Sequence, residues 1–208
     1  MYIPSHFKMD DEEQIFQVIK ENGFGILVSM NKGEPVATHL PLMLNKSKGA
    51  LYDHFARPNK QWKESENQQV LAIFQGPHSY ISPTWYETTK AVPTWNYVAV
   101  HVYGKIEFFN EQEEVFRTLN DLVTKYEPSD SVYHLKNLDT DYIEGMSKGI
   151  VAFRINITKI EAKSKLSQNH SRNRQRLIMN HLESTSQQDH LQIASLMKKN
   201  LKNAPDDN

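Results

Sequence analysis

The stretch "VPTWNYVAVHVYGKIEFF", residues 92–109, decides the fold class. Within it, three valines occupy every second position, Val98, Val100 and Val102. Alternation with a period of two predicts a long strand that buries one face. The central segment of the chain is therefore expected to belong to a β-sheet.

Five further segments are predicted to be strands, and short turns such as "NKGEP" and "NKSKG" join the first three of them. These strands span residues 24–30, 36–44, 50–55, 69–76 and 149–165. Adjacent strands with short turns favour an antiparallel sheet, most simply a closed barrel.

Helices are predicted before, between and after the strands. The segment 10–21 can be capped by Asp10 or Asp11, and Asn110 can cap the helix 110–127. A short helix is expected to start near Pro58. The tail from about 169 to 202 is predicted to form two helices.

The fold class is thus α+β, mainly β, with two parts. Residues 1–166 are expected to form the barrel domain, and residues 167–208 a helical extension packed on it.

Composition excludes several classes of protein. The chain has 208 residues, a net charge of −1 and no cysteine, so disulfides and thiolate sites are excluded and any nucleic-acid contact must be local. No membrane span, signal peptide, metal-ligand spacing, GxGxxG or Walker motif is visible. We expect a soluble cytoplasmic protein.

The strand-to-helix junction "HFARPNKQW", residues 54–62, has the chemistry of an anion site. Arg57 precedes the expected helix, and Asn59 and Lys60 lie in its first turn. A helix N-terminus beside an arginine suits a phosphate. The alternative is an ordinary surface junction with solvated charges.

Two other segments place polar groups beside apolar ones. Thr38 and His39 interrupt an apolar strand, so one of them must find a partner in the core or in a pocket. A core histidine held by a hydrogen bond is the alternative to a ligand contact there.

Two Pro-Thr-Trp repeats bring Trp85 and Trp95 into one window of the sequence. Flat rings could form a slot for a planar heterocycle, with Asn96 and Gln75 at its polar edge. An aromatic minicore is the alternative.

One basic cluster lies in "KSKLSQNHSRNRQRL". Its arginines, Arg172, Arg174 and Arg176, could contact the phosphates of a ligand or of DNA, or could form a solvated face. The tail helices resemble a helix-turn-helix in outline, but Asp189 would face the DNA phosphates unfavourably.

Six segments occur in an order that resembles a known family: "MYIPSHF", "THLPL", "HFARPNKQW", "GPHSYISPTWY", "VPTWNYVAVHVYG" and "KLSQN". Together they resemble the PaiB-type FMN-binding negative transcriptional regulators over nearly the whole chain. The resemblance implies a split β-barrel of the flavin-reductase and pyridoxamine-phosphate-oxidase kind. It also implies a homodimer with FMN between the subunits, and repression of protease-synthesis and sporulation genes.

The resemblance also implies a set of FMN contacts. The phosphate would be held at the first junction, the ring would lie against the second strand and the aromatic loops, and "KLSQN" would complete the phosphate or ribityl side. The implied contacts are Arg57, Asn59, Lys60, Thr38, His39, Gln75, Trp85, Trp95, Asn96, Lys165, Ser167 and Gln168. The chain departs from the family pattern at Asp53, Lys60 and His170, where glycine, proline and arginine are usual.

Three functions are compatible with these residues. The leading hypothesis is the regulator, which acts on DNA directly or through a partner. The second is a flavin reductase or small-substrate oxidase, although the only acid–base groups expected near the pocket are four histidines. The third is a barrel dimer with an empty aromatic crevice. No catalytic residue and no metal ligand is assigned.

Overall fold

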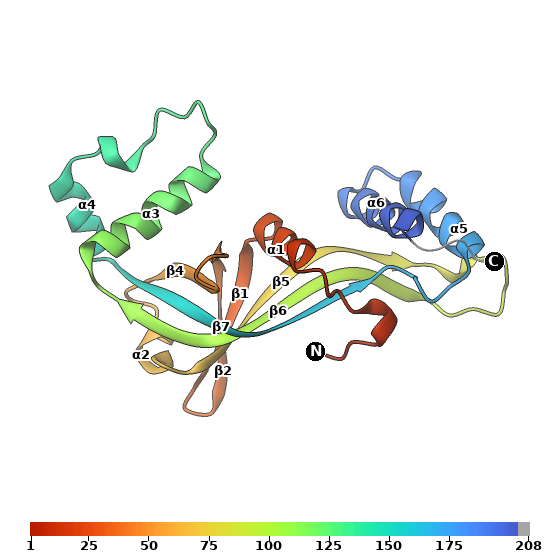
Figure 1. The fold of residues 1–208 in the computed structure, drawn as a ribbon, viewed down its shortest axis with the longest axis horizontal. Coiled ribbons are helices and arrows are strands. Elements are labelled where there is room, and N and C mark those ends of the chain that lie inside the picture. Colours follow the sequence, from red (N-terminus) through yellow and green to blue (C-terminus); the bar gives the residue numbers. More distant parts are fainter. Residues whose placement is uncertain (204–208) are drawn as a thin grey trace. The chain divides into compact units, whose positions relative to one another are not determined.

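The computed structural model describes residues 1–203 and contains a seven-stranded antiparallel sheet together with several helices (Figure 1). The helices are α1 (Glu12–Glu21), α2 (Gln61–Ser65), α3 (Gln112–Tyr126), α4 (Thr140–Ser147), α5 (Arg172–Glu183) and α6 (Gln188–Asn203). The strands are β1 (Phe24–Asn31), β2 (Glu34–Pro41), β3 (Met43–Asn45), β4 (Ala50–Ala56), β5 (Gln69–Ile81), β6 (Thr94–Phe109) and β7 (Ile150–Lys165). The predicted α+β class with a predominance of strands is confirmed.

The chain divides into two compact units, and the strands β5, β6 and β7 contribute to both. Unit 1 contains Met1–Val18, Gln75–Val100 and the described residues from Glu161 onward. Unit 2 contains Ile19–Phe74 and His101–Ile160. Each predicted site residue therefore belongs to one unit or the other.

Unit 2 contains parts of all seven strands, in the order β2-β1-β5-β6-β7-β4-β3. The sheet pairs β4 with β7 so that Leu51 lies opposite Ile155, and both side chains are wholly buried. The rings of Phe55 and Phe153 pack with their centroids 4.9 Å apart. Burial of these side chains supplies the main stabilisation of the unit.

The alternation that opened the sequence analysis is seen in β6. Val98, Val100 and Val102 are each at most 2% exposed. Further along, the backbone of β7 passes so close to Gly104 that a Cβ atom there would lie 2.4 Å from the carbonyl oxygen of Asn156. A residue without a side chain is therefore required at this position.

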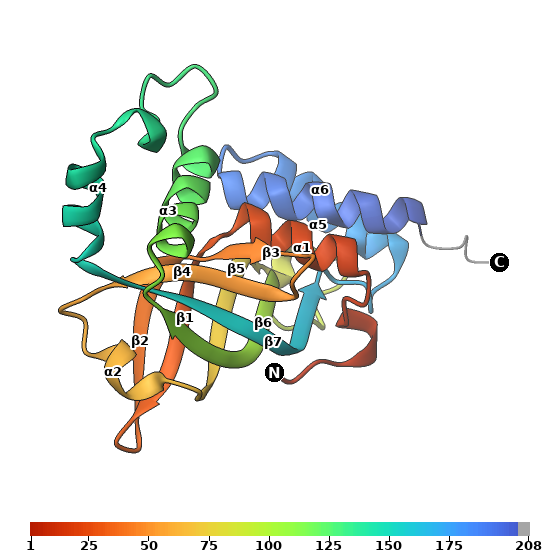
Figure 2. The ribbon, with the colours of Figure 1, turned by 60° about the vertical axis from the view of Figure 1, so that its left-hand side comes forward.

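The tail forms two helices, as predicted, and both belong to unit 1. α5 and α6 lie against each other (Figure 2), and their apolar faces share a buried cluster with Ile81 at the end of β5 and Leu166 after β7. Ile178, Leu182 and Ile193 are wholly buried in this cluster. These contacts fix the two helices to the ends of the strands.

Three predicted boundaries were wrong. The strand expected at 36–44 is divided into β2 and β3, because the chain bends at the buried Leu42, whose amide donates to the Leu40 carbonyl. α2 begins at Gln61 rather than near Pro58, because the preceding residues form a turn. α3 has Glu111 at its N-cap rather than Asn110, whereas Asp11 caps α1 as predicted by accepting from the Gln14 amide.

Asp53 of β4 is wholly buried, where the family pattern usually has glycine. Neither carboxylate oxygen makes a hydrogen bond, although Oδ1 lies 3.2 Å from Nδ1 of His54. Burial raises the pKa of Asp53, and the nearby His54 and Lys125 oppose this rise. The ionised carboxylate therefore lowers the stability of the folded protein.

We expect Asp53→Asn to stabilise the protein at pH 7, raising the melting temperature by about 2–4 °C for each kcal/mol recovered. Folding raises the pKa of Asp53, so ionisation of Asp53 lowers the stability at pH values above the folded pKa. Below the unfolded pKa, which is about 4, Asp53 is protonated in both states and the stabilisation by Asp53→Asn disappears. Calorimetry across pH measures this, with the exposed Asp130→Asn as control. A lower melting temperature for Asp53→Asn at pH 7 would show that Lys125 stabilises the ionised form.

Candidate functional site

A cavity of about 460 Å³ lies within unit 1, between the loop that follows Trp85 and the turn that follows β7. Phe7, Tyr86, Thr94, Lys165, His170 and Arg174 are among its lining residues. We call it the Lys165 pocket. It combines aromatic and aliphatic walls with four basic side chains, Lys90, Lys165, His170 and Arg174, which is the composition expected of a site for an anion with an apolar body.

Lys165 is a partly buried basic group of this pocket, and its Nζ is held by uncharged groups. Its Nζ donates to Oγ1 of Thr94 at 2.6 Å and to the carbonyl of Trp95 at 2.5 Å, and lies 5.6 Å from the centre of the Phe7 ring. Within residues 1–203 no carboxylate pairs with it. Burial, together with the charge of Lys163, lowers its pKa. The negative charge of a bound anion would oppose both effects and raise this pKa.

The turn that follows Lys165 is held by the other predicted residues of "KLSQN". Ser167 has φ of +64°, and its buried Oγ donates to Oδ1 of Asn96 at 3.1 Å. Gln168 accepts from the amide of Leu166 and donates to the carbonyl of Ser164, both at 2.6 Å. In this structure these polar groups shape the turn and present Lys165 to the cavity.

Arg174, which was predicted to contact DNA, is engaged inside unit 1. Its guanidinium pairs with the carboxylate of Glu87, with Nη2 2.6 Å from Oε1. It also lies over the ring of Tyr86, 4.8 Å from the ring centre. Sequence reasoning did not find Glu87, because the pair joins residues 87 positions apart.

The two Pro-Thr-Trp repeats place their indole rings against different partners. Trp85 stacks on His181 of α5, with ring centres 5.2 Å apart and an interplanar angle of 13°. Trp95 is 52% exposed and lies near the rings of His78 and Tyr80. No contact joins the two indoles among those described within residues 1–203, so a shared slot stays a prediction.

Gln75 lies near this exposed aromatic group, because its amide contacts Nδ1 of His78 at 3.2 Å. Asn96 is wholly buried on the neighbouring strand, where its amide approaches the sulfur of Met197 at 3.6 Å. Both predicted contacts of a ring edge thus have partners inside unit 1.

In unit 2, Arg57 ties two segments of backbone together. Its Nε donates to the carbonyl of Lys148 and its Nη2 to that of Ile150, both at 2.6 Å. In turn, Nε1 of Trp62 donates to the Arg57 carbonyl at 2.9 Å. Two of the three guanidinium nitrogens are therefore occupied in joining the end of β4 to the start of β7.

Thr38, Asn59 and the buried Gln61 form one hydrogen-bond network in unit 2. Oγ1 of Thr38 donates to Oε1 of Gln61 at 2.5 Å and accepts from Nδ2 of Asn59 at 3.0 Å. Nε2 of Gln61 donates to the Leu27 carbonyl and to Oγ of Ser29, both at 3.0 Å. The network fastens α2 to β1 and β2.

The two remaining predicted contacts of unit 2 lie beside this network. Of the two polar residues predicted in this strand, Thr38 is the one that joins the network. His39 is exposed, and its ring lies 6.0 Å from that of Phe24. Lys60 is the N-cap residue of α2, and its side chain makes no capping bond. Sequence reasoning missed Gln61, because a glutamine within "NKQW" has no pattern that predicts burial.

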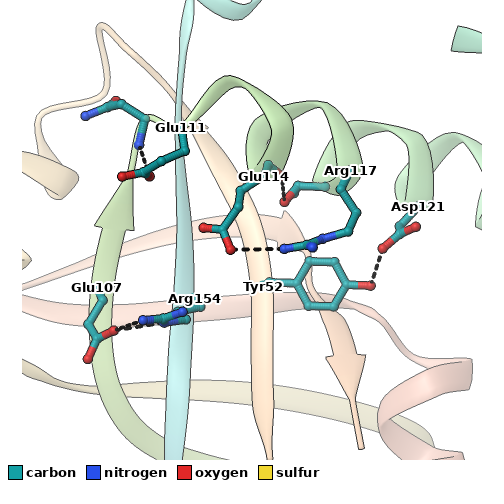
Figure 3. Close-up of polar contacts among 9 residues, drawn as sticks. Tyr52, Glu107, Glu111, Glu114, Arg117, Asp121 and Arg154 are labelled. Carbon is teal, nitrogen blue, oxygen red and sulfur yellow. Dashed lines mark hydrogen bonds and ion pairs between the residues drawn. The ribbon is translucent and has the colours of Figure 1, made fainter. Parts of the chain in front are cut away.

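A second cavity, of about 200 Å³, lies in unit 2 between α3 and the strands β4, β6 and β7. Figure 3 shows Tyr52 pointing its hydroxyl at Asp121 of α3, to which it donates at 3.0 Å. Arg117 pairs with Glu114, and Arg154 with Glu107. Burial and Asp121 raise the pKa of Tyr52 to about 12. Because each of these arginines has an acidic partner, this cavity lacks the unbalanced charge of the Lys165 pocket.

Comparison with known proteins identifies the family. The family model described as "Putative FMN-binding domain" matches residues 1–159. The chain belongs to this family. The match ends before Lys165, so it contains the part of the pocket lined by Phe7, Tyr86 and residues 90–94 but not the part lined by Lys165 and the residues after it.

One curated relative extends over the whole FMN-binding domain and the tail. "Protease synthase and sporulation protein PAI 2" of Bacillus subtilis (strain 168) is 41% identical over 206 residues, which cover 97% of this chain and 99% of that protein. The resemblance to PaiB-type proteins is thereby confirmed.

Solved structures show the fold alone. The flavocytochrome Anf3 of Azotobacter vinelandii superposes with a TM-score of 0.62 at 14% identity, covering 78% of this chain and 72% of that one. The FAD and heme binding protein of Mycobacterium smegmatis gives 0.60 at 11% identity, covering 76% and 73%. The split-barrel class that we predicted is confirmed. Within residues 1–203, no helix has the length and apolar character needed to cross a membrane.

We expect Gln61→Ala to lower the free energy of unfolding by about 1–3 kcal/mol or more, because it leaves buried hydrogen-bonding groups of β1 and β2 without partners. Urea unfolding measures the change. Gln69→Ala is the matched control, since Gln69 is exposed and its amide makes one bond, to Thr158. Equal effects of the two substitutions would contradict the role of the network.

Proposed function

We propose that this chain is an FMN-binding negative regulator of transcription that acts as a homodimer and controls protease-synthesis and sporulation genes. The observation that carries the proposal is the 41% identity to PAI 2 over 97% of the chain. The match of residues 1–159 to an FMN-binding family supports the choice of cofactor.

The Lys165 pocket fits the anionic part of FMN. A phosphate needs a cation that is not already neutralised, and Lys165 is such a cation. Phe7 and Tyr86 add apolar surface beside it. We assign the phosphate contact to Nζ of Lys165, which the Ser167–Asn96 bond helps to position. When bound, FMN supplies a flavin ring that can exchange electrons.

The residues of unit 2 form the second candidate set for the cofactor. Arg57 has Nη1 left for an anion, since its other nitrogens bind carbonyls, and Lys60 lies beside it in sequence. Thr38 and Asn59 bind Gln61, so they would act by holding the junction in shape, with His39 outside the network. Substitutions at Lys165 and Arg57 separate the two assignments.

A second copy of the chain is proposed to cover the exposed aromatic group on β5 and β6. Trp95 is 52% and Tyr80 45% exposed, and the His78 ring lies beside Trp95. Large aromatic side chains grouped at a surface are typical of protein interfaces. Covering them in a dimer would also bring further aromatic walls to a flavin.

Direct contact with DNA would have to use the start of α5. Arg174 is paired with Glu87, so we assign the proposed phosphate contacts to the other two arginines of the predicted set, Arg172 and Arg176. α6 is not suited to reading DNA: its Ile193 and Met197 are wholly buried, and Asp189 of its first turn lies 3.6 Å from His78. With a net charge of −1, regulation through a protein partner is the alternative.

The visible spectrum of the purified protein, before and after addition of FMN, tests the cofactor. We expect Lys165→Ala to weaken FMN binding by about tenfold to a hundredfold, the range for loss of a charge-assisted contact, and to leave riboflavin, which lacks the phosphate, unaffected. The exposed Lys159→Ala is the control. Weaker FMN binding by Arg57→Ala, together with unchanged FMN binding by Lys165→Ala, would assign the phosphate contact to unit 2.

Failure of the wild-type protein to take up FMN would contradict the proposal. Rapid turnover of NADH or NADPH with bound FMN would favour the flavin reductase over the regulator.

A salt titration of DNA binding tests the direct form of regulation. We expect Arg172→Ala combined with Arg176→Ala to reduce the slope of log affinity against log salt by about two, because two phosphate contacts are lost. Arg117→Ala, in unit 2, is the control. Absence of any shift of promoter DNA at low salt would remove the direct form.

A further inference from the structure

Glu87 neutralises one of the basic groups of the Lys165 pocket. It lies in the loop between the short helix Pro83–Trp85 and β6, and it reaches Arg174 at the start of α5. Nη2 of Arg174 is 2.6 Å from Oε1, and Nε is 3.1 Å from Oε1 and 3.2 Å from Oε2. Hydrogen bonding to Arg174 lowers the pKa of Glu87, so the carboxylate stays ionised.

The charge around the pocket is otherwise positive. Lys90, Lys165, His170 and Arg174 line it, and none of the described lining residues is acidic. Burial, together with the charges of Arg174 and Lys165, lowers the pKa of His170. The carboxylate of Glu87 thus occupies a position beside Arg174 at which an external anion could also bind.

Arg174 has contacts that do not depend on Glu87. Its guanidinium lies 4.8 Å from the centre of the Tyr86 ring, and Nη1 is 3.5 Å from Nδ1 of His170. The backbone amide of Arg174 donates to Oγ of Ser171, which caps α5. The guanidinium can therefore stay at the pocket wall when its carboxylate partner leaves.

A phosphate can take the place of a carboxylate at an arginine with the same paired geometry. It also carries more negative charge, and beside it Lys165 offers a second cation that Glu87 does not reach. Exchange of the carboxylate for a phosphate would therefore neutralise two basic groups in place of one.

We propose that Glu87 is an internal anion, which the phosphate group of the bound ligand displaces from Arg174. The proposal rests on the proposed function, because it takes FMN as the ligand. Displacement frees the loop of residues 86–93, which lines the pocket and follows directly on Trp85. Trp85 stacks on His181 of α5. Binding of the ligand in the pocket is thereby linked to the stacking contact between Trp85 and α5, the helix that contains Arg172 and Arg176.

Glu87→Gln tests the displacement, because it removes the charge and keeps the shape of the side chain. We expect FMN to bind about threefold to tenfold more tightly and riboflavin to bind unchanged, since an exposed ion pair contributes little and only the phosphate competes with it. Glu107→Gln is the control, since it breaks another pair of a glutamate with an arginine, Arg154, in unit 2.

Hydrogen exchange of the loop provides the second readout. In the wild-type protein FMN should increase amide exchange in residues 86–93, and in Glu87→Gln the increase should be present without FMN. Unchanged or weaker FMN binding by Glu87→Gln, or FMN-induced protection of this loop, would overturn the displacement and leave FMN binding intact.

Inorganic pyrophosphate separates the two proposals if the wild-type protein takes up no FMN. Tighter binding of pyrophosphate by Glu87→Gln than by the wild-type protein would then support the displacement of Glu87, although the proposal that the chain binds FMN would be contradicted. Equal binding of pyrophosphate by both proteins, or none, would contradict the displacement as well.

Discussion

The burial of every second side chain along β6 is the constraint on which the structure depends. This strand of 16 residues contributes to both units and buries Val98, Val100 and Val102. Since one strand serves two cores, its register fixes the position of its polar residues as well as its apolar ones. Thr94 and Asn96, at its start, are thereby placed to bind Lys165 and Ser167, so the geometry of the Lys165 pocket follows from the packing of the sheet.

The elements of the fold could be predicted from local patterns, because alternation and capping residues act over a few positions. The site could be predicted only in part. Lys165 was identified through "KLSQN", whereas Gln61 and Glu87 were missed, since their partners Ser29 and Arg174 are distant in sequence. Arg57 shows that a distant partner can also change the role of a predicted residue. Its positive charge was evident in the sequence, but its guanidinium donates to two backbone carbonyls that are 91 and 93 positions away.

The polar residues of the chain serve two purposes that the sequence does not distinguish. Those of the Thr38 network satisfy one another and stabilise unit 2. Those of the Lys165 pocket leave a positive charge without a carboxylate within residues 1–203. A fully satisfied network favours a single rigid structure, whereas an unbalanced charge favours a ligand. This difference in electrostatic balance is the physical basis for placing the candidate site in unit 1.

The close approach of β7 to Gly104 has a genetic consequence. Every other amino acid carries a side-chain carbon where the Asn156 carbonyl already stands. Every missense change of this codon therefore creates a steric clash, even when the new side chain is small or apolar. Inherited variation in β6 should be tolerated at the exposed Lys105 and absent at Gly104, even though Gly104 touches no proposed ligand.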